Sequence, residues 1–153
     1  MNSPYSDPED APTPDDSSPT PSGGRPPKVI YFSASELYNI NDRVTDGNTF
    51  VRDINLLNSA ARRPSLALFG EPQFPSVIDK AAALLHSLAY HHLFADGNKR
   101  TAHAVVSQFL TQNGWSPTWT DAEQAAFILE VAQGKHEVEA VAVWLAAHTV
   151  KEP

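Results

Sequence analysis

Segment 76–91 has the most apolar helical pattern in the chain, and this pattern restricts the fold more than any other feature. Its apolar side chains recur every three or four residues, which is the period of an α-helix. They are Val77, Ala81, Leu84, Leu85 and Leu88. A helix this apolar must be covered by other elements, so we expect it to lie at the centre of the core. Extending the stripe places His92 on the same inward face, at the end of the helix.

Several flanking segments show the same helical period. A helix is expected from Ser33, where Ser33 and Glu36 form a capping-box pair, and another over 120–133, where Thr120 and Glu123 do the same. Three more are expected over 51–63, 98–113 and 138–150. In the first of these three, the residues expected on the buried face are Val51, Ile54, Leu57 and Ala61. No segment alternates convincingly and no repeat is found, so the predicted fold is all-α, with about six helices.

Segment 62–75, RRPSLALFGEPQFP, interrupts the helical pattern. It carries three prolines and one glycine around a short apolar run. Proline and glycine disfavour helix and mark turns, so this segment is expected to form a short extended flap or loop.

The first 28 residues differ in composition from the rest of the chain. They hold eight of the thirteen prolines and five acidic residues, and Tyr5 is their only aromatic residue. Such a segment cannot bury enough apolar surface to fold, so residues 1–28 are expected to be a disordered tail and 29–153 the folded domain. A proline-dependent partner motif in the tail is the less favoured alternative.

Length and charge exclude several classes of protein. A chain of 153 residues suits one domain. A net charge of −7 argues against broad binding to nucleic-acid phosphates. The lack of cysteine fits a reducing compartment, and no apolar run or N-terminal signal pattern suggests a membrane or secreted protein. We therefore expect a cytoplasmic protein without membrane or direct nucleic-acid partners.

Polar side chains gather in HHLFADGNKRTAHA, residues 91–104, between two apolar helices. If His92 is buried at the end of the first helix, its neutral imidazole can act as a general base near neutral pH. An isolated histidine of this kind would more often be a hydrogen-bonded core residue. The residues near His92 favour a functional role instead, because a carboxylate and two cations follow within eight residues.

The start of the second helix is suited to phosphate. Free N–H groups and the positive end of the helix dipole attract anions, and Gly97 lets the backbone approach a ligand closely. Asn98 can cap the helix and donate to a ligand, while Lys99 and Arg100 add a point charge and a bidentate fork. Asp96 could cap a turn, but beside a polyphosphate it is the kind of carboxylate that holds a hydrated Mg²⁺ ion. The stretch therefore predicts a phosphoryl- or nucleotidyl-transfer site.

Residues 92–100, HLFADGNKR, resemble the signature of the Fic/Doc family, H-x-F-x-[D/E]-G-N-x-R, at every fixed position. The resemblance extends over about Val29 to Val150 and implies a compact helical domain with a flap. Lys99 stands where the adenylyl-transferring Fic branch commonly has glycine, and with Thr101 and Ala102 it is similar to the Doc toxin branch. That branch implies ATP-dependent phosphorylation of a hydroxyl group on a protein, with elongation factor Tu as the target and translation arrest as the result.

The resemblance also implies a role for each motif residue. His92 would be the general base and Asp96 the Mg²⁺ ligand, while Asn98 would orient the phosphates that Lys99 and Arg100 clamp. Phe94 would anchor the loop in the core. The flap would line up the target, and Arg62 and Arg63 could hold nucleotide or target phosphate there, although exposed arginines are more often simply solvated.

Alternatives remain open at this point. The same fold could serve an adenylyl transferase or a non-catalytic binding module, and a metal hydrolase with His92 and Asp96 as ligands is the least favoured. Many Fic enzymes carry an inhibitory helix of pattern [S/T]-x-x-x-E-[G/N], but no Glu here is followed by Gly or Asn. A separate antitoxin is therefore expected, whose end folds as a helix into an apolar groove.

Overall fold

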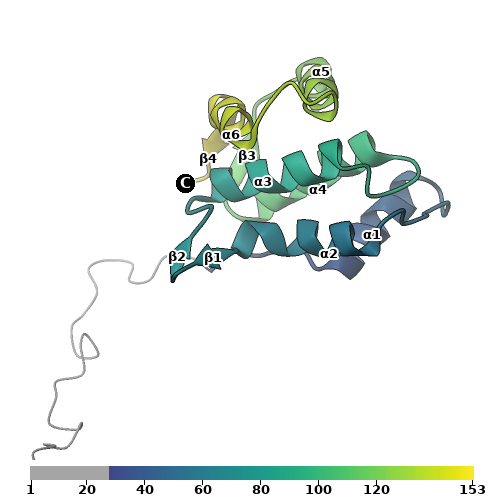
Figure 1. Cartoon of the computed structure of the whole chain (residues 1–153). Coiled ribbons are helices and arrows are strands. Elements are labelled where there is room, and N and C mark those ends of the chain that lie inside the picture. The colour runs from purple at the N-terminus through teal and green to yellow at the C-terminus, as the bar shows by residue number, and fades with distance from the viewer. Residues whose placement is uncertain (1–27) are drawn as a thin grey trace, which may run out of the picture.

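The computed structural model describes residues 28–153, and these are mostly helical (Figure 1). The predicted all-α class is confirmed, as six α-helices lie in this range; the predicted disordered tail, apart from Lys28, lies outside the described residues. The helices are α1 (Ala34–Val44), α2 (Ile54–Arg62), α3 (Val77–Tyr90), α4 (Asn98–Gln112), α5 (Asp121–Ala132) and α6 (Val138–Ala147), and a short 3₁₀ helix, η2 (Arg63–Ser65), follows α2. The strands are β1 (Ala67–Leu68), β2 (Glu71–Pro72), β3 (Trp115–Pro117) and β4 (Thr149–Lys151).

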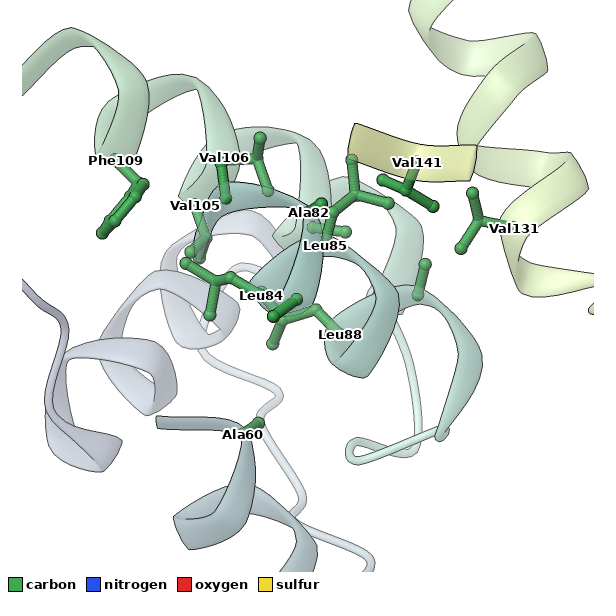
Figure 2. Packing of buried hydrophobic residues seen from close by; sticks show 14 of the residues in the cluster. Ala60, Ala82, Leu84, Leu85, Leu88, Val105, Val106, Phe109, Val131 and Val141 are labelled. Atoms are coloured by element: carbon green, nitrogen blue, oxygen red, sulfur yellow. The ribbon is translucent and has the colours of Figure 1, made fainter. Parts of the chain in front are cut away.

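Helix α3 lies at the centre of the core, as its apolar stripe predicts. It packs against α4 alongside it, with α1 and α2 on one side of this pair and α5 and α6 on the other (Figure 1). Leu84, Leu85 and Leu88 of α3 are almost completely buried, and Val105 and Val106 of α4 lie close to them (Figure 2). Burying each such side chain contributes about 1.5–3 kcal/mol, so the α3–α4 pair is the stable base on which the loop between them is held.

Capping boxes fix where three of the helices begin. The predicted capping boxes are present, with Ser33 and Glu36 at α1 and Thr120 and Glu123 at α5. A third, formed by Ser76 and Asp79, starts α3. Each box satisfies N–H groups that a helix start leaves free.

The prediction for the second helix was wrong about where the helix begins and about which residues form its buried face. Helix α2 begins at Ile54 because the carboxylate of Asp53 accepts from the N–H groups of Asn55 and Leu56. Only Leu57 of the four predicted residues is fully buried, and the core face is completed by Ala60. Ile54 is 58% exposed.

Two short antiparallel pairs of strands add to the helices. β1 pairs with β2, which confirms a flap within the predicted segment 62–75, although residues 62–65 belong to α2 and η2; β3 pairs with β4. The last helix ends at Ala147 rather than at Val150, because residues 149–151 pair with β3 instead of continuing the helix. Within residues 28–153, no helix combines the length and apolar character that a membrane crossing needs.

Candidate active site

The loop that joins α3 to α4 carries the predicted site, and two buried side chains hold it in place. Leu93 and Phe94 are 0% and 1% exposed. The backbone on either side is bonded to the segment before α2, since Arg52 N–H donates to Leu93 O (2.8 Å) and Ala95 N–H donates to Phe50 O (2.9 Å). The loop is therefore pinned by its apolar residues, as predicted for Phe94, and its polar residues project outward.

The prediction that His92 is buried at the end of a helix was wrong. Helix α3 ends at Tyr90, and His92 has a φ of +49°, which is left-handed and takes the chain out of the helical path. Leu93 therefore enters the core instead, and His92 is exposed. Its side chain makes no hydrogen bond to another residue in 28–153, so both ring nitrogens can meet a ligand. A left-handed non-glycine residue is uncommon, and such residues cluster at functional sites.

Asn98 does not cap α4, contrary to the prediction, because Gly97 occupies the cap position and Asn98 is the first helical residue. The amide of Asn98 reaches back instead. Its Oδ1 accepts from Phe94 N–H (3.1 Å) and its Nδ2 donates to Phe94 O (2.8 Å). Asn98 therefore holds the loop closed around the buried Phe94, and only the second hydrogen of its Nδ2 group remains to donate elsewhere.

Gly97 lies against the end of α1. Its φ is +77°, and a Cβ at this position would lie 2.7 Å from Thr45 Cγ2 and 3.3 Å from Asn41 Nδ2. Both the backbone conformation and the close approach require glycine. Gly97 therefore lets the start of α4 pack closely against the end of α1.

Asn41 of α1 is a positioning residue that the sequence did not reveal. Its side chain is completely buried, and its Nδ2 donates to Asp96 O (2.9 Å) and to Thr101 Oγ1 (3.0 Å). These two bonds fix the residue before Gly97 and the first turn of α4 to α1. No local signal marks Asn41, since its partners lie 55 and 60 residues further along the chain.

The charged residues of the motif lie at the surface around the first turn of α4. Arg100 donates from Nη1 to Val44 O (2.6 Å), and its Nη2 lies 3.6 Å from Asp96 Oδ2. Lys99 is exposed and makes no hydrogen bond or ion pair with other residues of the described range. Among described residues no side chain caps α4 or α6, whereas side chains cap the starts of α1, α2, α3 and α5. Two cations at an uncapped positive helix end favour an anionic ligand.

Asp96 fits a hydrated metal ion held together with a ligand, and does not fit a site made by protein alone. Its Oδ1 accepts from Gly97 N–H (2.7 Å), and both oxygens are at the surface. Over residues 28–153, no group of three or more histidine, cysteine, aspartate or glutamate side chains could hold a metal ion. Mg²⁺ commonly uses one or two carboxylates and takes its other oxygens from phosphate and water.

The two arginines at the base of the flap have different surroundings. Arg62 is exposed, whereas Arg63 is half-buried and reaches across to α3. Its Nη1 donates to Ser87 Oγ (3.0 Å) and lies 3.4 Å from His86 Nδ1, and the ring of Phe74 lies 5.5 Å from its guanidinium carbon. Burial lowers the pKa of Arg63, an effect that Glu139 opposes.

The charge of Arg63 acts on two histidines at the end of α3, His86 and His91. Burial lowers the pKa of His91, and the neighbouring charges of Arg63 and His92 lower it further. The pKa of His86 is also lowered, first by burial and then by Arg63 and His91, while Glu137 and Glu139 act in the opposite direction. Burial and the charge of Arg63 thus act in the same direction on both histidines.

Two comparisons place the chain among known proteins. A family model described as Fic/DOC family matches residues 31–110, more than half of the chain. The chain is also 42% identical over 84 residues to a protein named Toxin Doc from Mycolicibacterium smegmatis (strain ATCC 700084 / mc(2)155). That match covers 55% of this chain and 65% of the relative, so the chain spans slightly less than two thirds of that protein's length.

Proposed function

Because the chain belongs to the Fic/Doc family, in its Doc branch, we propose that it is a transferase that moves the γ-phosphoryl group of ATP onto a hydroxyl group of a protein. The observation that carries the proposal is the arrangement around the first turn of α4. An exposed histidine precedes an uncapped helix start that bears two cations, Lys99 and Arg100. This combination offers a proton acceptor beside a place for phosphate.

In the proposed reaction, His92 accepts the proton of the target hydroxyl group. The hydroxyl oxygen forms a bond to the γ-phosphorus, the bond from that phosphorus to the oxygen bridging the β- and γ-phosphates breaks, and ADP leaves. The N–H groups at the start of α4, with Lys99 and Arg100, stabilise the charge on the transferred group. Arg100 is well suited to this task because its bond to Val44 O fixes the direction of its other donors.

Magnesium belongs to the same proposal. A Mg²⁺ ion bound beside Asp96 would supply positive charge to the phosphate oxygens. Asp96 is held for this role through its carbonyl oxygen, which accepts from Asn41 Nδ2. The Oδ2 atom of Asp96 lies 3.6 Å from Arg100 Nη2. This ion pair is exposed and therefore weak, so a metal ion can take the place of Arg100 beside the carboxylate.

We further propose that the protein is the toxin of a toxin–antitoxin pair and that it arrests translation by modifying elongation factor Tu. The relative's name, Toxin Doc, supports the first part. For the antitoxin, a cleft of about 480 Å³ between α4 and α5 offers an apolar groove bordered by Lys99 and Arg100. A helix that is seated there would lie directly beside the phosphate-binding turn.

Incubation of purified full-length protein with ATP, Mg²⁺ and elongation factor Tu tests the activity, with intact-mass spectrometry of the target as the readout. We expect a gain of one phosphoryl group, lost in His92→Ala and kept in the control His136→Gln, which lies at the connection from α5 to α6. A gain of one AMP would instead identify an adenylyl transferase. Growth arrest in bacteria expressing His92→Ala, at the level of wild type, would favour the non-catalytic module.

A further inference from the structure

A small pocket lies between α2 and α3 at the base of the flap, next to the site described above. Its volume is about 270 Å³. It is lined by Leu56, Ser59, Ala60, Arg63, Leu66, Gln73, Ser87 and His91. The flap closes one side through Leu66 and Gln73, which are joined by a backbone bond from Gln73 N–H to Leu66 O (2.9 Å). On the α3 side, its wall includes His91, the residue directly before His92.

The walls of this pocket are apolar or neutral except at Arg63. Arg63 uses Nη1 for Ser87 and His86, and its guanidinium has three further N–H donors, on Nε and Nη2, in a planar fork. In the part of the chain that the structure describes, it has no carboxylate within ion-pair distance. Glu137 and Glu139 of the α6 end act on this region only from further away. A half-buried guanidinium with free donors is suited to a carboxylate.

We propose that this pocket is a subsite for an acidic side chain of the protein target, a glutamate or aspartate near the hydroxyl group that is modified. The inference rests on the proposed function, because it assigns part of the substrate to the same site. A volume of about 270 Å³ accommodates one side chain and not a folded segment. The target backbone would lie along the flap, and the acidic side chain would enter between Leu66 and His91 to meet Arg63.

His91 offers a readout for this assignment that is independent of catalysis. Burial lowers the pKa of His91, and the charge of Arg63 lowers it further. A bound carboxylate would offset the positive charge of Arg63 and so raise the pKa of His91. This change can be followed by NMR without any catalysis.

The test uses full-length protein and capped peptides that contain one threonine. A single glutamate is placed at successive positions around the threonine, and matched peptides carry glutamine at the same position. We expect one position at which the glutamate peptide binds about tenfold or more tightly than its glutamine partner, since a hydrogen-bonded charge in a partly buried site is worth at least that much. Its binding should also shift the ring signals of His91 and raise the pKa of that residue.

Three variants separate the subsite from a general loss of charge. Arg63→Gln should abolish the preference for glutamate and leave the KM for ATP unchanged, and Lys151→Gln, an exposed charge at the far β4, should keep the preference. Gln73→Glu should also abolish it, by placing a carboxylate beside Arg63. Because Gln73 is exposed on the flap, this second variant tests the pocket even if Arg63→Gln does not fold.

The results distinguish this inference from the proposed activity. Three results would overturn the subsite. The first is equal binding of glutamate and glutamine peptides at every position, and the second is no binding of any acidic peptide. The third is an Arg63→Gln variant that changes the binding of ATP but not that of peptide. If the peptides are phosphorylated but glutamate does not improve binding at any position, the transferase proposal is supported and the subsite is refuted. An Arg63-dependent preference without transfer would keep the subsite and refute the activity.

Discussion

Replacing Gly97 with alanine measures how tightly the turn at the start of α4 is packed against α1. The change has two separate costs. A left-handed φ of +77° costs an alanine about 1 kcal/mol relative to glycine, and the new Cβ would lie 2.7 Å from Thr45 Cγ2. Overlap of this kind in a packed interior costs about 1–3 kcal/mol. We therefore expect Gly97→Ala to lower the free energy of unfolding by about 2–4 kcal/mol.

Two controls isolate these costs. Gly47 has a φ of +83° and no atom within 4 Å of an added Cβ, so Gly47→Ala should lose only the backbone part, about 1 kcal/mol. Thr45→Ser removes the methyl group in the way but keeps the hydroxyl that donates to Asn41 O (2.8 Å). In the Thr45→Ser background, the cost of Gly97→Ala should therefore fall toward that of Gly47→Ala, with the part due to Asn41 Nδ2, 3.3 Å from the added Cβ, remaining.

Urea unfolding followed by circular dichroism is the assay, with the midpoint shift at constant slope giving the free-energy change. In thermal melts, Gly97→Ala should lower Tm by about 8–16 °C, as 1 kcal/mol corresponds to roughly 4 °C in a domain of this size. Target phosphorylation should fall with Gly97→Ala and not with Gly47→Ala. The reasoning fails if Gly97→Ala costs no more than Gly47→Ala, or if Thr45→Ser recovers none of the loss.

The remaining predictions concern three other parts of the site. Asn41→Ala should cost about 2–3 kcal/mol of stability by urea unfolding, since two buried hydrogen bonds are lost; an unchanged midpoint would contradict this. Arg100→Lys should lower kcat/KM at least about tenfold with little change in Tm, because lysine keeps the charge but not the fork anchored on Val44; equal kinetics would refute it. Since folding lowers the pKa of His86 and His91, the unfolded chain binds more protons and stability should fall as pH drops below about 6.5. The variant His86→Asn/His91→Asn should show a smaller loss between pH 7.5 and 5.5, and an identical loss would count against this assignment.

Local patterns in the sequence were sufficient to predict that the fold is helical and where most of the helices lie. A capping box needs only residues three apart, and a core-facing stripe needs only the helical period, so α1, α3 and α5 were predicted close to their observed limits. The same period failed at His92, since it cannot show where a helix stops when the next residue turns left-handed. It also failed for α2, whose start is set by Asp53 and whose Ile54 is exposed.

The tertiary structure alone decided how the motif is held. Asn41, Thr45 and Val44 meet the start of α4 across more than fifty residues of chain, and Arg63 reaches Ser87 across 24, so nothing local in the sequence marks them. The sequence by itself determined which polar groups lie together in one loop, because that depends only on side-chain type and spacing. Their orientation depends on buried hydrogen bonds and close packing between α1 and α4, and these exist only once the chain has folded.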